Sequence, residues 1–166
     1  ARVNIGNSLR DQKKYEESIV EYEKVVAMPK AHPRHKSDAQ RLIGHSLRDM
    51  KKYEESNKAF EKVLAMKGAS PYHVHVALIY IGHNYNSLKK PDKAVEFFAK
   101  AAANLKSPPH WRSDALYNEG NAYYNLKQYD KAKAAYEKIL ANPKSNPYHI
   151  KKAKEKIKQI DALNKK

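Results

Sequence analysis

Histidine is the residue type best suited to chemistry in this sequence, which holds eight histidines and no cysteine. His32 and His35 lie three residues apart, and His73 and His75 lie two apart, so each pair is close enough to share a metal ion. A tetrahedral zinc site would need further ligands, yet neither cysteine nor a cluster of carboxylates lies beside them. Four aromatic side chains also recur at one interval: His35, His73, Trp111 and His149. We therefore predict a packing role for these rings, with no metal site and no cofactor.

The serines and carboxylates form no recognisable catalytic set. The sequence has neither a glycine-flanked nucleophile motif nor a glycine-rich phosphate loop. The acids lie mainly where helices are expected to start, as in Glu16-Glu17 and Glu54-Glu55, where they interact favourably with the helix dipole. Glu119 is the exception, because it falls on an expected core stripe. It is either buried with a raised pKa or, as we favour, reaches solvent or a lysine. We predict that the chain is not an enzyme.

An internal repeat of 38 residues sets the positions of these side chains. An apolar residue or an acid precedes a glycine at Ile5-Gly6, Ile43-Gly44, Ile81-Gly82 and Glu119-Gly120. The same interval separates the aromatic residues Tyr22, Phe60, Phe98 and Tyr136, and the prolines Pro33, Pro71, Pro109 and Pro147. Because several independent positions share one period, we expect a repeat architecture.

Each repeat is predicted to form two helices, called here the first and the second helix. In the second repeat, Ile43 and Leu47 lie on the apolar stripe of a first helix that begins near Ser37. Ser37 or Asp38 is the expected N-cap, with Pro33 upstream in the connecting loop. The second helix is expected from about Tyr53 to Met66. The glycine of each first helix suggests close approach of the second helix, where a small residue follows twelve positions later: Ser18, Ser56, Ala94 and Ala132.

This pattern resembles the tetratricopeptide repeat, as the residues Ile81-Gly82, Tyr85, Ala94 and Phe98 illustrate. The resemblance covers nearly the whole chain. It implies an all-α fold, a right-handed superhelical α-α solenoid of four helix-turn-helix repeats plus a C-terminal capping helix. Within one domain, 1–166, the expected repeats span about 1–34, 35–72, 73–110 and 111–146, with the cap at 148–163. The family's usual repeat has about 34 residues, and we place the four extra residues in the connecting loops.

The first helices of such an array line its concave groove. The helical period then predicts which side chains contact a peptide or protein partner there. These candidates are Asn7, Arg10, Arg41, His45, Arg48, Ile79, His83, Asn86, Tyr117, Asn121, Tyr124 and Asn125. The asparagines and histidines among them form a ladder able to hydrogen-bond to an extended backbone. The arginines suit a carboxylate, and the tyrosines suit an interface anchor.

One peptide mode known in this family is a carboxylate clamp for acidic chaperone tails. Asn7 matches the asparagine of that clamp, but Val3 stands where its lysine is expected. Val76 and Tyr80 occupy the later basic positions. The clamp is not reproduced, and we do not predict that ligand.

Two other functions remain open from the sequence. The formal net charge of +15 favours acidic partners, including nucleic acid, although the lysines are scattered and do not gather on the predicted groove. The chain could also be a structural spacer that self-assembles through an uncapped first repeat exposing Ile5 and Leu9. With no apolar run near the ~20 residues of a spanning helix and no signal pattern, we expect a soluble protein without membrane insertion. Both a cytoplasmic and a bacterial periplasmic location are allowed.

Overall fold

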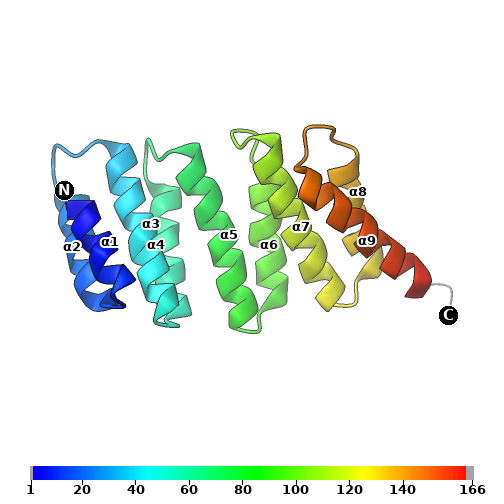
Figure 1. Cartoon of the computed structure of the whole chain (residues 1–166), viewed down its shortest axis with the longest axis horizontal. Helices are drawn as coiled ribbons and strands as arrows, with labels where there is room; N and C mark the ends of the chain where they lie inside the picture. Colours follow the sequence, from blue (N-terminus) through cyan, green and yellow to red (C-terminus); the bar gives the residue numbers. More distant parts are fainter. Residues whose placement is uncertain (1, 164–166) are drawn as a thin grey trace. The chain divides into compact units, whose positions relative to one another are not determined.

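The computed structural model describes residues 2–163, which form nine α-helices and contain no strand (Figure 1). The predicted all-α helical-repeat solenoid is confirmed. The first helices are α1 (Arg2–Asp11), α3 (Pro33–Asp49), α5 (Pro71–Ser87) and α7 (Pro109–Asn125). The second helices are α2 (Tyr15–Ala27), α4 (Tyr53–Ala65), α6 (Pro91–Ala103) and α8 (Tyr129–Leu140), and α9 (Pro147–Leu163) ends the array. No helix within these residues is both long enough and apolar enough to cross a membrane.

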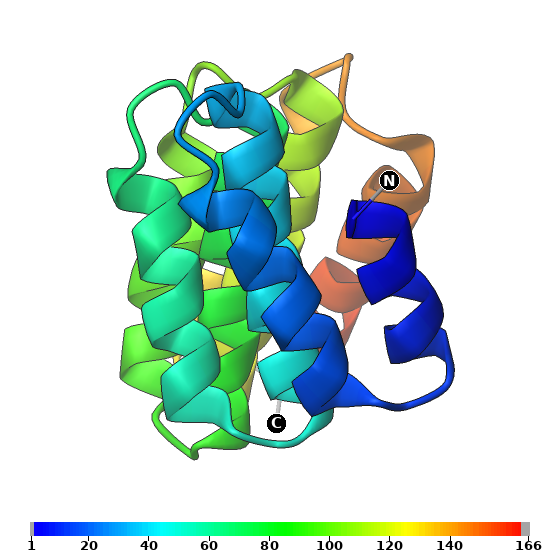
Figure 2. The ribbon, with the colours of Figure 1, turned by 90° about the vertical axis from the view of Figure 1, so that its left-hand side faces the viewer.

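The chain divides into two compact units, and each is described by itself. Unit 1 comprises residues 1–88 with α1 to α5, and unit 2 comprises residues 89–166 with α6 to α9. In unit 1 the hairpins α1–α2 and α3–α4 pack in sequence order, followed by α5 against α4. Figure 2 shows α1 and α2 antiparallel at the front. In unit 2, α7 packs against α6 and α8, and α9 packs against α8. The prediction of a single domain stays a prediction.

The first helices begin one turn earlier than predicted. Pro33 is the first residue of α3, and His32 is its N-cap, so the prediction of Ser37 or Asp38 as N-cap is wrong. Proline is favoured at this position because its φ is preset and the missing N–H has no helical partner there. α3, α5 and α7 therefore have 17 residues each, four more than the 13 of α2, α4 and α6. Residues from Pro33 on, which the sequence placed in the connecting loop, thus belong to the first helix, and the loop keeps residues 28–32.

An aromatic ring from the second helix packs directly on the glycine of the first. A Cβ added at Gly44 would lie 2.8 Å from ring carbons of Phe60, and Gly6 and Gly120 face Tyr22 and Tyr136 in the same way. The predicted close approach of the two helices is therefore confirmed in these three hairpins. The aromatic ring packs on the glycine in addition to the small residue that the sequence indicated. In the second repeat, Ser56 Oγ also donates a hydrogen bond to the Gly44 carbonyl oxygen (2.8 Å).

Each unit has its own apolar core. Tyr22, Ile43 and neighbouring side chains form it in unit 1, and Tyr136 and Ile139 pack with Ala153 and Ile160 of α9 in unit 2. The capping helix thus closes the core as predicted, starting at Pro147 and not at residue 148. Two apolar side chains of the first hairpin stay half exposed, Ile5 (50%) and Val20 (49%).

Glu119 is buried in unit 2 with only 8% of its surface exposed. Burial raises the pKa of its carboxyl, and the positive charge of the nearby Lys138 acts in the opposite direction. The carboxyl oxygens are not among the buried side-chain atoms that lack a hydrogen-bond partner in the described chain. The residue therefore combines the two expectations: most of it is buried with a raised pKa, and its carboxyl keeps a nearby lysine and some contact with solvent.

A lysine in the left-handed backbone region ends every first helix. Lys13, Lys51, Lys89 and Lys127 have φ values of 62°, 61°, 56° and 59°. At the end of α3, Lys51 N–H donates to the Arg48 carbonyl (2.8 Å) and Lys52 N–H donates to that of Leu47 (2.9 Å). This is the Schellman geometry, in which glycine is the preferred residue at the left-handed position. Lysine there carries backbone strain in every repeat.

We expect Lys51→Gly to raise the free energy of unfolding by about 0.5–1 kcal/mol, because relief of left-handed strain exceeds the entropy that glycine adds to the unfolded chain. Lys52→Gly is the matched control, since Lys52 has φ −82° and gains nothing from glycine. Urea denaturation of both variants measures the difference. Equal or lower stability of Lys51→Gly would contradict the strain argument.

Candidate functional site

In unit 1, the candidate residues come from α1, α3 and α5, and two of the three arginines already have carboxylate partners. Arg10 Nε and Nη2 donate to Asp49 Oδ2 at 3.0 and 2.7 Å, which ties α1 to the end of α3. Arg41 Nε and Nη2 donate to Asp38 Oδ1 at 3.2 and 2.6 Å within α3. The positive charges of these two guanidinium groups are therefore already compensated by aspartates, and they would attract an anionic ligand less strongly than the sequence suggested.

Of the three candidate arginines in unit 1, Arg48 is the one without a carboxylate partner in the described part of the chain. Its guanidinium lies over the ring of Tyr80 on α5, with 5.1 Å from Cζ to the ring centroid. Its Nε is buried and has no hydrogen-bond partner among residues 2–163. A cation over an aromatic face is attracted by the ring quadrupole, which fixes the guanidinium plane. Tyr80 was not among the predicted contacts, although it lies 32 residues after Arg48 on the adjacent first helix.

The predicted ladder of hydrogen-bonding residues turns out to be bound to the second helices. Tyr22 donates its hydroxyl to Asn7 Oδ1, and Tyr136 donates its hydroxyl to Asn121 Oδ1, both at 2.8 Å. In the second repeat the aromatic residue is Phe60, which has no hydroxyl. The ladder residue there is His45, which packs edge-on against that ring at 5.3 Å.

The type of ladder residue thus follows the aromatic residue fifteen positions later in all four repeats. Asparagine precedes tyrosine and histidine precedes phenylalanine: Asn7 and Tyr22, His45 and Phe60, His83 and Phe98, Asn121 and Tyr136. A buried hydroxyl needs a hydrogen-bond partner, whereas a phenylalanine ring needs only packing. This pairing was readable from the sequence and was missed.

Two predicted contacts in unit 1 are buried. Ile79 is 6% exposed and belongs to the core. His45 is 8% exposed and lies edge-on against Tyr80 at 4.4 Å. Burial, with the nearby charges of Arg41, Arg10 and Arg48, lowers the pKa of His45 to about 3. Neither side chain lies on the open face where the sequence placed it.

The remaining candidates of unit 1 lie near the surface of α5. The His83 ring is edge-on to Tyr80 at 6.0 Å, so it joins the same aromatic group as Arg48. Asn86 is exposed one turn further along the helix. We call the group Arg10, Arg41, Arg48, Tyr80 and His83 the arginine face.

In unit 2, the predicted tyrosines on α7 contact α9 and α8. Tyr117 stacks on His149 with ring centroids 5.5 Å apart, and Tyr124 meets Tyr129 edge-on at 5.4 Å. Lys156 Nζ lies 4.7 Å from the centroid of the Tyr124 ring. Asn125 is exposed at the end of α7.

The pair of Tyr124 and Lys156 repeats the pair of Arg48 and Tyr80, 76 residues later, with cation and ring exchanged. A cation thus contacts a ring at the same repeat position between α3 and α5 and between α7 and α9. In unit 2 the ring lies on the earlier of the two helices. Each unit therefore presents a different group at this position.

The histidines at the start of first helices have the predicted packing role in two places. His73 Nδ1 is 2.7 Å from Ser37 Oγ, and its Nε2 is 3.4 Å from Asp38 Oδ1. His149 meets Ser113 and Asp114 in the same way, at 3.4 and 3.6 Å. Burial lowers the pKa of both histidines, while the adjacent aspartate opposes the shift. Among residues 2–163, no group of three or more His, Asp or Glu side chains is placed to hold a metal ion.

The pairing of ladder and aromatic residues can be tested by a double-mutant cycle. His45→Asn with Phe60→Tyr recreates in the second repeat the bond between Asn7 and Tyr22. We expect the double variant to be about 1 kcal/mol more stable than the sum of the two single effects, because each single variant leaves one polar group mismatched. Urea denaturation of the four proteins measures the coupling. Additive effects would show that the pairing is coincidental.

The buried His45 predicts acid sensitivity. Its lowered pKa means that the folded state keeps the ring neutral while the unfolded state takes up a proton below pH 6.5. Stability from this group is complete above pH 6.5 and is lost as the pH falls towards about 3, by up to about 1.4 kcal/mol per pH unit. The double variant His45→Asn, Phe60→Tyr should lose less stability between pH 7 and 4. Parallel pH curves for wild type and variant would contradict this assignment.

Comparison with known proteins supports the repeat architecture along most of the chain. Models described as "Tetratricopeptide repeat" match residues 73–145 and residues 1–32 and 39–69. No curated protein matches the sequence.

Several solved structures share the fold at low sequence identity. The crystal structure of MamA has a TM-score of 0.69 and 22% identity, covering 96% of this chain and 84% of that chain. YrrB, described as a TPR protein with an unusual peptide-binding site, has a TM-score of 0.65 and 17% identity, with 99% and 76% covered. A putative kinesin light chain of Podosopora anserina with nearly identical TPR-like repeats has a TM-score of 0.65 and 15% identity, with 98% and 93% covered. Together with the matched repeat models and the nine helices of residues 2–163, these likenesses lead to one conclusion: the chain belongs to the tetratricopeptide repeat family.

Proposed function

We propose that the chain is a protein-interaction scaffold, not an enzyme, and that the arginine face of unit 1 binds an extended peptide through a carboxylate of that peptide. Tetratricopeptide repeats support a role in protein interaction generally. The finer assignment rests on Arg48, the arginine of this face without a carboxylate partner among the described residues.

Arg48 is held ready for an anionic ligand. Its contact with Tyr80 fixes the plane of the guanidinium, and its Nε is shielded from water. A fixed guanidinium loses little side-chain entropy on binding and offers paired donors that match the two oxygens of a carboxylate. The two flanking arginines are neutralised by Asp49 and Asp38, so the uncompensated charge is localised at Arg48.

Two asparagines of unit 1 outside the arginine face suit a peptide backbone. Asn7 uses its Oδ1 for Tyr22, which leaves its Nδ2 donors for a ligand carbonyl. Asn86 is exposed on α5 and can both donate and accept. A peptide with an acidic side chain near Arg48 would thus be read partly by charge and partly by its backbone.

The test uses a set of eight-residue fluorescent peptides, each carrying one Glu and matched to a Glu→Gln version, with binding followed by anisotropy. We expect the acidic peptides to bind more tightly, and Arg48→Gln to weaken them about ten-fold or more, since a charge-assisted hydrogen bond is lost. Arg34→Gln removes the same charge from the exposed start of α3 and is the control. Equal affinity for Glu and Gln peptides, or no effect of Arg48→Gln, would refute the proposal.

Nucleic-acid binding is a second candidate, favoured by the charge of unit 2. Residues 89–166 hold 18 basic and 8 acidic residues, a net charge of +10, against +5 for residues 1–88, which hold 15 basic and 10 acidic. Tyr148 on α9 is 59% exposed and could stack on a base. RNA binding that falls steeply with salt and is lost in Tyr148→Ala but kept in Arg48→Gln would favour this function instead.

A further inference from the structure

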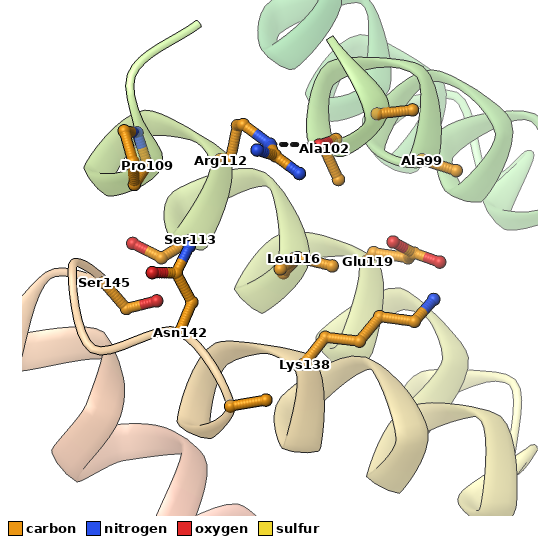
Figure 3. Close-up of a pocket in the computed structure, with 12 residues that line it drawn as sticks. Ala99, Ala102, Pro109, Arg112, Ser113, Leu116, Glu119, Lys138, Asn142 and Ser145 are labelled. Atoms are coloured by element: carbon orange, nitrogen blue, oxygen red, sulfur yellow. Dashed lines mark hydrogen bonds between the residues drawn. The ribbon is translucent and has the colours of Figure 1, made fainter. Parts of the chain in front are cut away.

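Unit 2 contains a cavity on a face of α7 separate from the tyrosines described above. It has a volume of about 500 Å³ and lies between α6 and α8, with α7 as its floor (Figure 3). Ala99 and Ala102 form the α6 wall, and Leu116 lies in the middle of the floor. The α6 wall is therefore small and apolar, whereas the opposite wall carries Lys138 and Asn142. The charged groups of the floor lie towards its two ends.

Unit 1 has a groove of the same geometry but different chemistry. It lies between α2 and α4 over α3, with about 490 Å³, and six of its eleven lining residues precede lining residues of the unit 2 cavity by 76 positions. Ile43 stands at the position of Glu119, and Gln40 stands at that of Leu116. A groove of this shape is thus a regular product of the repeat. The buried carboxyl is particular to unit 2.

Glu119 is an acid at one end of the cavity. The residue as a whole is 8% exposed, but its carboxyl oxygens are not among the buried side-chain atoms that lack a hydrogen-bond partner in the described chain, so they keep some contact with solvent. Figure 3 shows the carboxyl beside the ammonium of Lys138, whose positive charge favours the ionised carboxylate. A ligand ammonium that replaces this solvent would give the carboxylate a charged donor.

Arg112 supplies the opposite charge at the other end. Its Nε donates to the Ala102 carbonyl (2.9 Å), which fixes the guanidinium at the rim, and its terminal nitrogens pair with no carboxylate of the described chain (Figure 3). Arg112 and Glu119 are seven residues apart on α7, so their Cα atoms are separated by about 10 Å along the helix. Leu116 lies between them on the same stripe.

We propose that this cavity binds a lysine-type zwitterion, with the ligand's ammonium at Glu119, its carboxylate at Arg112 and its methylene chain over Leu116. Charge complementarity selects this class. Glu119, Arg112 and Lys138 together carry one excess positive charge, which disfavours a plain amine, whereas a plain carboxylate leaves Glu119 without a donor. A chain of about five methylenes spans the two helical turns. Free lysine and the C-terminal lysine of a peptide share this chemistry.

Isothermal titration calorimetry with 6-aminohexanoate is the primary test, with hexylamine and hexanoate as matched probes. We expect saturable one-to-one binding of 6-aminohexanoate with a Kd of about 1 mM or tighter and no saturation by the other two. Nα-acetyl-lysine keeps the ε-ammonium and the carboxylate but has no free α-amine, so it imitates a C-terminal lysine. Comparing its affinity with that of free lysine distinguishes the two sources. Binding of hexylamine or hexanoate as tight as that of the zwitterion would overturn the proposal, as would the absence of saturation by 6-aminohexanoate.

Variants locate the site. Glu119→Gln and Arg112→Gln should each weaken 6-aminohexanoate about ten-fold or more. Glu137→Gln and Lys106→Gln remove the same charges from exposed positions of unit 2 and should leave affinity unchanged. Circular dichroism checks that each variant folds, and Glu119→Gln keeps the size of the side chain while removing its charge. Amide NMR shifts on titration should centre on Leu116 and Ala102. Unaltered affinity in Glu119→Gln, or shifts centred elsewhere, would refute the site.

Discussion

The packing of an aromatic ring on a glycine backbone is the constraint on which each described hairpin depends. Tyr22 on Gly6, Phe60 on Gly44 and Tyr136 on Gly120 leave no room for a Cβ, so they set the distance between first and second helix. The type of buried ring also determines which side chain of the first helix contacts it. A tyrosine hydroxyl donates a hydrogen bond to an asparagine, and a phenylalanine ring packs against the edge of a histidine. Residues that look like ligand contacts are thus partly determined by the core beneath them.

Because the ladder residues bind to the core, the proposed recognition rests on a few side chains that the repeat does not need. In unit 1 the neighbouring carboxylates quench Arg10 and Arg41, and Tyr80 supports Arg48 without quenching it. In unit 2 the same contact is built with its partners exchanged, as Tyr124 and Lys156. Cation–π pairs hold a charge in place and leave its hydrogen-bond donors available. The repeat therefore fixes the position of this contact, and the residue types at that position differ between the two units.

The helices, the repeat period and the capping role of α9 could be predicted from the sequence, because they depend on local spacing that 38-residue periodicity makes unambiguous. The site was harder to predict. His45 and Ile79 were placed on an open stripe by helical period alone, which cannot tell how much of a helix face the next repeat covers. The apolar side chain of Ile79 already favoured a buried position. The start of α3 was misplaced because proline was assigned to the loop, although its preset φ suits the first helical turn equally well. The contact of Arg48 with Tyr80 and that of Arg112 with the Ala102 carbonyl required coordinates, since each joins two helices and no local pattern in the sequence marks it.

The additional turn at the start of the first helices bears on how the repeats can be exchanged. His73 and His149 lie in that turn, and each reaches back to the serine and aspartate of an earlier first helix. A neighbour that lacked this turn would also lack the imidazole, which would leave a buried serine without its cross-helix partner. Exchange of a repeat would therefore preserve this contact only where the incoming repeat keeps the turn and its histidine.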